Sequence, residues 1–112
     1  MTDVDEVDGV LAALAEPVRR RVLDLVAARG EATATVLAGD LPVSRQAVVK
    51  HLAVLEAAGL VVARRAGREV LFSVRPERLA ATARWLAARA AAWDARLAAI
   101  RRLAESAPPP SP

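Results

Sequence analysis

Residues 37–60, LAGDLPVSRQAVVKHLAVLEAAGL, constrain the fold of this chain more than any other segment. Pro42 cannot continue a helix, and it holds the residue before it in extended conformations, so the backbone breaks there. Ser44 stands directly before an apolar-periodic run, where its hydroxyl can cap the first helical turn. Gly59 ends that run, because glycine closes a last turn at little cost. The segment therefore predicts two helices joined by a tight turn, a helix-turn-helix.

The second of these helices has an apolar side and a polar side. Val48, Leu52 and Leu55 recur at spacings of four and three, which places them together against a core. The polar side of the first turns carries groups that suit base edges, since arginine and glutamine can each bond a base at two points and valine can meet a thymine methyl. A plain solvated face is the alternative, but an apolar valine among polar neighbours favours a partner surface. We predict that this helix contacts DNA through Ser44, Arg45, Gln46, Val49 and Lys50.

The net charge of +3 is distributed unevenly along the chain. Residues 1–16 hold five acids and no base, whereas residues 17–75 hold ten bases and five acids. A basic excess of this kind is typical of domains that bind a phosphate backbone, which predicts double-stranded DNA as a partner. The bases are spread over several predicted elements, which argues against a basic amphipathic helix on a membrane surface.

Composition excludes several other classes of protein. A chain of 112 residues supports one domain with a modest core. The absence of cysteine excludes disulfides and thiolate metal sites, and one Phe and two Trp argue against a large aromatic-lined pocket. No apolar run approaches the length of a membrane span and the acidic N-terminus is unlike a signal peptide, so we expect a cytoplasmic protein.

Two further helices are expected before the helix-turn-helix. Apolar residues Val4, Val7, Leu11 and Leu14 share one face of the first. Pro17 suits the first position of the second, which ends near Gly30. Thr33 is the expected N-cap of a short third helix, which is the first of the helix-turn-helix pair.

After Gly59 the pattern changes to β-rich runs. Residues 60–65 and 70–74 are predicted strands, and residues 66–69 connect them as a hairpin, or wing. Basic residues gather near its tip, which suits contact with phosphates or a minor groove. An edge strand kept soluble by charge is the alternative reading. The predicted DNA contacts of the wing are Arg64, Arg65 and Arg68.

A long helix is expected from Pro76 to Ala104. Its apolar residues step alternately by four and three over more than three heptads, and a seam of that length needs a partner surface. We predict a homodimer and keep intramolecular packing as the alternative. Residues 1–105 are expected to form the domain, and residues 106–112 a disordered Pro-rich tail. The predicted dimer interface comprises Val7, Leu11, Leu86, Trp93, Leu97 and Ile100.

Catalysis finds no support, because the chain has no plausible Ser/His/Asp arrangement and no glycine-rich phosphate loop. The expected fold is mainly α with a small β-hairpin: a winged helix-turn-helix domain with N- and C-terminal dimerisation helices. The rival to DNA binding is a winged-helix module that docks on proteins through its long helix. Salt dependence separates the two, since phosphate contacts weaken steeply with added salt.

The strings ALAEPVRRRVLDLV, LPVSRQAVVKHLAVLEAAGLV and RRAGREVLFSV resemble the ArsR family of winged helix-turn-helix repressors, over about residues 4–104. The resemblance implies a dimeric repressor that binds an imperfect inverted repeat near its own promoter. Thr33 and Thr35 stand where the metal sensors of the family carry cysteines, and residues 76–105 contain no histidine. A non-metal-sensing branch with no metal and no cofactor is therefore expected. His51, the only histidine, is expected to pack or to cap, and no small-molecule inducer is identified.

Overall fold

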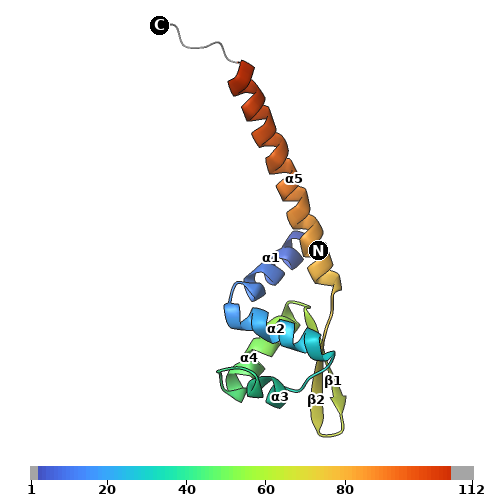
Figure 1. The fold of residues 1–112 in the computed structure, drawn as a ribbon. Coiled ribbons are helices and arrows are strands. Elements are labelled where there is room, and N and C mark those ends of the chain that lie inside the picture. The colour runs from blue at the N-terminus through green and yellow to red at the C-terminus, as the bar shows by residue number, and fades with distance from the viewer. Residues whose placement is uncertain (1–2, 107–112) are drawn as a thin grey trace. The chain divides into compact units, whose positions relative to one another are not determined.

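The computed structural model describes residues 3–106, which form five helices and one antiparallel hairpin (Figure 1). This confirms the predicted fold class. The described chain divides after Thr82 into two compact units, the second being the remainder of α5. The elements are α1 (Asp3–Leu14), α2 (Pro17–Arg29), α3 (Ala34–Gly39), α4 (Arg45–Ala57), β1 (Val61–Ala66), β2 (Glu69–Val74) and α5 (Glu77–Ser106).

The C-terminal helix runs two residues further than expected, since Glu105 and Ser106 are helical. The rest of the predicted tail, residues 107–112, lies outside the described residues. Within residues 3–106, no helix combines the length and the apolar character needed to cross a bilayer.

Three helices begin at side-chain caps. Glu16, Thr33 and Ser44 have extended backbones, and an oxygen of each side chain accepts a backbone N–H of the following turn at 3.1–3.2 Å. The caps at Thr33 and Ser44 confirm the sequence predictions. The longer Glu16 side chain reaches two N–H groups, and the bond from Val18 is the main reason that the pKa of Glu16 lies below its ordinary value.

The end of α4 is closed by Gly59 in the left-handed region, at φ 78°. Its N–H donates to the carbonyl of Glu56 at 2.9 Å, and the N–H of Leu60 donates to the carbonyl of Leu55 at 2.9 Å. These two bonds define a Schellman motif. Arg78 adds a third bond, from Nη1 to the carbonyl of Ala58 at 3.0 Å, so the predicted stop at Gly59 is confirmed and reinforced.

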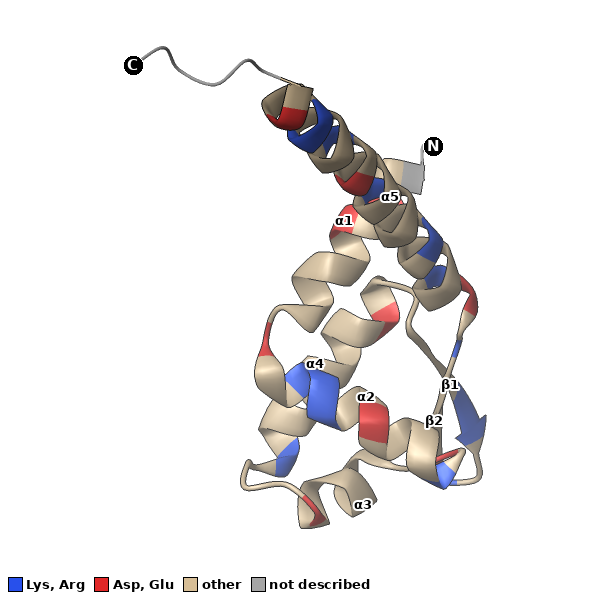
Figure 2. Ribbon diagram, turned by 45° about the horizontal axis from the view of Figure 1, so that its top comes forward, with Lys and Arg blue, Asp and Glu red and all other residues tan. Residues whose placement is uncertain are grey.

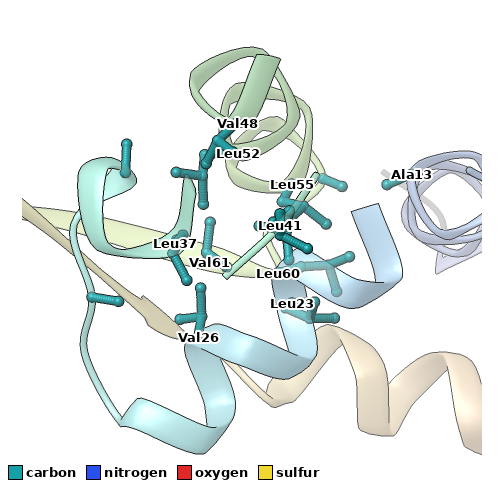
Figure 3. Close-up of a cluster of buried hydrophobic side chains, with 14 of the residues drawn as sticks. Ala13, Leu23, Val26, Leu37, Leu41, Val48, Leu52, Leu55, Leu60 and Val61 are labelled. Atoms are coloured by element: carbon teal, nitrogen blue, oxygen red, sulfur yellow. The ribbon is translucent and has the colours of Figure 1, made fainter. Parts of the chain in front are cut away.

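The core lies beneath α4. Val48, Leu52 and Leu55 are at most 1% exposed, which confirms the predicted apolar stripe. In Figure 3 these side chains gather with Leu37 of α3 and Val61 of β1. The helix-turn-helix and the base of the hairpin therefore share one core with α2, and that core sets the angle at which the outer face of α4 is presented.

The buried face of α1 differs from the predicted one. Val7, Val10 and Ala13 are at most 2% exposed, whereas Val4 and Leu11 are 49% and 38% exposed. The spacing of three residues between buried positions rotates the inner face by a fraction of a turn from the predicted stripe. The apolar residues of α1 lie on adjacent faces, and the neighbouring helices select which face is covered.

The hairpin has a regular register from Val61 opposite Val74 to Ala66 opposite Glu69. Each strand reaches one residue further towards the tip than predicted, and β1 also begins one residue later, at Val61. Gly67 and Arg68 form the turn, with Gly67 at φ 64° and no non-glycine residue of the described chain at positive φ. Positive φ at the first turn residue alone is the pattern of a type II′ turn, which matches the twist of a two-stranded hairpin.

Candidate nucleic-acid interface

The N-terminal turns of α4 present the predicted reading residues to solvent. Arg45, Gln46, Val49 and Lys50 are all exposed. Val49 is 43% exposed although it lies one residue after a completely buried valine. The hydroxyl of Ser44 accepts the N–H of Ala47, so its side chain holds the start of the helix. An apolar group is thus displayed among three polar ones, as a base-reading surface requires.

Arg45 is held in place by a residue of the preceding helix. Its Nε donates to Oγ1 of Thr35 at 3.1 Å. This bond leaves both terminal amino groups of the guanidinium for another partner. Sequence reasoning missed the contact, because the two residues are ten positions apart and only the angle between α3 and α4 brings them together.

The three arginines predicted for the wing do not act as one group. Side chains alternate between the two faces of a strand, so Arg64 and Arg65 point to opposite faces of the hairpin. Arg65 shares its face with its partner Val70, whereas Arg64 lies opposite Leu71 on the other face. In Figure 2 the blue of Lys and Arg marks the part of β1 that leads to the hairpin turn.

Arg64 is engaged by Glu31 of the connection between α2 and α3. Its Nε and Nη2 donate to the two carboxylate oxygens at 2.6 and 2.8 Å, a bidentate ion pair. These bonds lower the pKa of Glu31 and raise the pKa of Arg64, because the charged forms stabilise each other. This guanidinium therefore ties the wing to the body of the protein, and a DNA contact at Arg64 stays a prediction.

A backbone pair reinforces that attachment. The N–H of Ala32 donates to the carbonyl of Phe72 at 3.0 Å, and the N–H of Phe72 donates back at 2.9 Å. Residue 32 thus pairs with the edge of β2 that β1 leaves open. The wing is anchored at adjacent residues, 31 and 32, by one ion pair and one backbone pair.

Arg65 and Arg68 are, like Arg64, exposed basic groups of the wing. Within residues 3–106, neither forms an ion pair. Arg68 lies in the turn itself, next to Gly67. The tip of the hairpin therefore presents two guanidinium groups that no protein carboxylate neutralises in the described part of the chain.

Comparison with known proteins identifies this arrangement. Residues 14–64 match a family described as "Helix-turn-helix domain". The HTH-type transcriptional regulator YuzN of Bacillus subtilis is 40% identical over 77 residues, which cover 62% of this chain and 84% of YuzN. An ArsR-like transcriptional regulator from Rhodococcus sp. RHA1 superposes with a TM-score of 0.81 at 43% identity, covering 93% of this chain and 97% of that chain. This chain belongs to the ArsR family of winged helix-turn-helix regulators.

The ArsR-family protein is therefore a transcriptional regulator with a helix-turn-helix DNA-binding domain. A third similar structure is the homodimeric winged helix-turn-helix DNA-binding domain of Mb0332 from Mycobacterium bovis. It superposes with a TM-score of 0.62 at 31% identity, covering 81% of each chain. The described part of this regulator, residues 3–106, contains no cluster of three or more His, Asp or Glu side chains able to hold a metal ion.

His51 of this regulator takes a packing position. Its side chain is only 20% exposed, and Nε2 lies 3.8 Å from a carboxylate oxygen of Glu16. The same carboxylate caps α2, so His51 connects α4 to the start of that helix. This agrees with the predicted packed or capping histidine.

The residues predicted for the dimer interface differ in how much of each side chain is exposed to solvent. Val7 is 2% exposed and belongs to the interior of the single chain, which corrects its assignment. Leu11 is 38% exposed. In α5, Leu86 and Leu97 are 47% and 46% exposed, and Trp93 and Ile100 are each 60% exposed. Leu103, which the heptad count passed over, is 71% exposed.

Proposed function

We propose that this ArsR-family regulator is a dimeric repressor that binds an imperfect inverted repeat near its own promoter. The observation that carries the proposal is the outer face of α4, where four exposed residues suited to base edges are backed by a stripe at most 1% exposed. A reading surface needs this rigid support, because base contacts depend on orientation. The proposal covers residues 1–105 as one functional unit that acts in the cytoplasm, without catalysis, metal or cofactor.

The residues of the interface take two roles. Arg45, Gln46, Val49 and Lys50 contact base edges in the major groove, and Arg65 and Arg68 contact the phosphate backbone or the adjacent minor groove. Ser44 holds the start of the reading helix through its cap. Arg64 positions the wing through its ion pair with Glu31, and its contact with the DNA backbone stays a prediction.

The dimer is proposed from the apolar stripe of α5. Four large side chains at heptad spacing, each 46–60% exposed, form a continuous apolar surface that a second copy would cover. On a lone protomer such a surface favours aggregation. The homodimeric state of the similar Mb0332 domain supports the same conclusion. The proposed interface comprises Leu11, Leu86, Trp93, Leu97 and Ile100.

Binding to the DNA upstream of the coding region tests the proposal. Two reading helices related by a dimer axis require half-sites about one helical turn, roughly 34 Å, apart. Fluorescence anisotropy with a duplex carrying such a repeat, and with a scrambled duplex, should give tight binding only to the first. Affinity should fall by about a thousandfold or more between roughly 50 and 200 mM salt if six or more phosphates are contacted. Equal affinity for both duplexes would overturn the base-reading roles, and no binding at low salt would favour a protein-docking module.

A further inference from the structure

A cleft of about 550 Å³ lies between the start of α3, the start of α4 and the tip of the hairpin, all within the unit that ends at Thr82. Its volume falls in the range of sites that bind small organic molecules. Among the residues that line it, Ala34, Val36, Val70 and Phe72 have no role in the proposed contacts with DNA.

The floor of the cleft is apolar. Val36, Val49 and Val70 come from three different elements and are 37–43% exposed, and the partly buried Phe72 lies beside them. Three half-exposed valines facing one hollow form a concave apolar surface, which an apolar ligand would cover favourably. An inorganic phosphate has no apolar part, so it would leave this apolar surface uncovered.

The rim of the cleft is positive. Arg45 and Arg68 contribute two guanidinium groups, against one carboxylate, Glu69. Arg45 uses only its Nε in the hydrogen bond to Thr35, so its two terminal amino groups can still donate to an anion. The hydroxyls of Thr33 and Thr35 complete the polar lining, and each already accepts a hydrogen bond within the protein. The lining therefore combines a hollow apolar floor with a net charge of one positive unit.

We propose that this cleft binds a small organic anion with an apolar body, such as an aromatic or medium-chain carboxylate or sulfonate, and that the bound anion excludes DNA. The exclusion rests on the proposed function, since the anion would cover Arg45 and Val49 of the reading face and Arg68 of the wing. The regulator would then release its operator by direct competition, with no change of fold.

The binding step is tested without DNA, with the fluorescent naphthalene sulfonate ANS as the probe. Val70 and Val62 make a matched pair, because they lie on opposite faces of the same hairpin and are 37% and 38% exposed. Val70→Asp should weaken saturable ANS binding by about tenfold, since it places a charge on the apolar floor, whereas Val62→Asp should leave it unchanged. Equal effects of the two variants, or no saturable binding by the wild type, would overturn the proposal.

A second pair guards against local unfolding of the hairpin. Val36→Asp on α3 should weaken ANS binding as Val70→Asp does. Val54→Asp should not, because Val54 lies on α4 outside the cleft at 40% exposure.

The role of charge is tested with N-phenyl-1-naphthylamine, which lacks the sulfonate. Arg68→Ala should weaken ANS binding by about fivefold and leave the uncharged probe unaffected. Equal effects on both probes would refute an anion site.

Competition tests the exclusion of DNA. Added operator duplex should displace bound ANS in proportion to the protein that it binds. Simultaneous binding of both would overturn the competition and leave the anion site intact. If the protein bound ANS at the cleft but no duplex, the proposed function would fail while the site itself stood.

Discussion

Helices α4 and α5 carry the same kind of apolar periodicity and use it in opposite ways. In α4 the stripe of Val48, Leu52 and Leu55 is at most 1% exposed. In α5 the stripe that contains Trp93 and Ile100 is 46–60% exposed at its large residues. Spacing determines which residues share a face of a helix, but it does not determine whether the same chain supplies the surface that covers them.

The apolar stripes of α4 and α5 have different physical roles. The stripe of α4 stabilises the protomer, because its side chains fill the shared core (Figure 3). The large side chains of the α5 stripe from Leu86 onward stay exposed in the described chain and are expected to act between copies. Substitutions in the two helices should therefore separate protomer stability from assembly.

The largest effect is expected from Leu52→Ala. Leu52 is 1% exposed, and its truncation removes buried methyl groups and leaves a cavity under the reading helix. The free energy of unfolding should fall by about 2–5 kcal/mol, as measured by denaturant titration. Val54→Ala, at 40% exposure on the same helix, is the control and should change it by about 0.5 kcal/mol or less. Similar losses for both variants would contradict the division of α4 into two faces.

Trp93→Ala should weaken dimerisation by about 2 kcal/mol or more, since a large aromatic side chain at an interface centre carries much of the binding energy. Analytical ultracentrifugation over a range of concentrations measures this effect, and operator affinity should fall in parallel. The control is Arg102→Ala, because Arg102 lies off the heptad seam on the same helix and is exposed. A Trp93 variant that dimerises like the wild type would refute the role of the α5 stripe.

Arg45→Ala should reduce discrimination at one base position of each half-site by about 1–3 kcal/mol. Binding to a set of duplexes with single-base changes measures this loss. Arg65→Ala should instead weaken specific and random DNA alike, because phosphate contacts carry no sequence information. If Arg45→Ala lowered affinity equally for every duplex, its assignment as a base reader would be wrong.

Thr35→Val should have a smaller effect at the same base position, about 1 kcal/mol or less, because it removes the hydrogen bond that orients Arg45 and leaves the guanidinium present. In the Arg45→Ala background the Thr35→Val substitution should change nothing further. Additive effects of the two changes would show that Thr35 acts independently of Arg45.

The smallest effect is expected from Glu31→Gln, which breaks the exposed ion pair with Arg64. The folded-state pKa of Glu31 is depressed, so its stabilising contribution is present above the ordinary value of 4.5 and is lost as pH falls through the lower folded-state pKa. Hydrogen exchange at the Phe72 amide should be faster in the variant at neutral pH, with the difference vanishing at low pH. A difference that persisted after Glu31 was protonated would exclude the ion pair as its cause.

Local sequence chemistry was sufficient for most of the helix boundaries and for the exposed residues at the start of α4. Pro42, Ser44 and Gly59 act through backbone geometry within a few residues, so the turn, the cap and the stop could be predicted from them. The exposure of Val49 followed from the same periodicity that buried Val48. These features need no knowledge of which distant segment packs against which.

The features that the sequence did not indicate depend on contacts between residues far apart in the chain. The ion pair of Glu31 with Arg64 spans 33 positions, and no spacing along the chain indicated it. Val7 was predicted for an interface, and packing within the chain buried it. The cleft between α3, α4 and the hairpin joins residues that have no common spacing, so no pattern along the chain could indicate it.

The sequence by itself determined the order and type of the elements, the break at Pro42 and the start and end of α4, because caps, turns and helical period are local properties of the backbone. Only the tertiary structure decided which arginines form ion pairs within the protein, which apolar helix stripe is covered by other elements, and where a surface cleft remains. Those outcomes depend on distances between side chains far apart in the chain, which packing sets and local propensity does not.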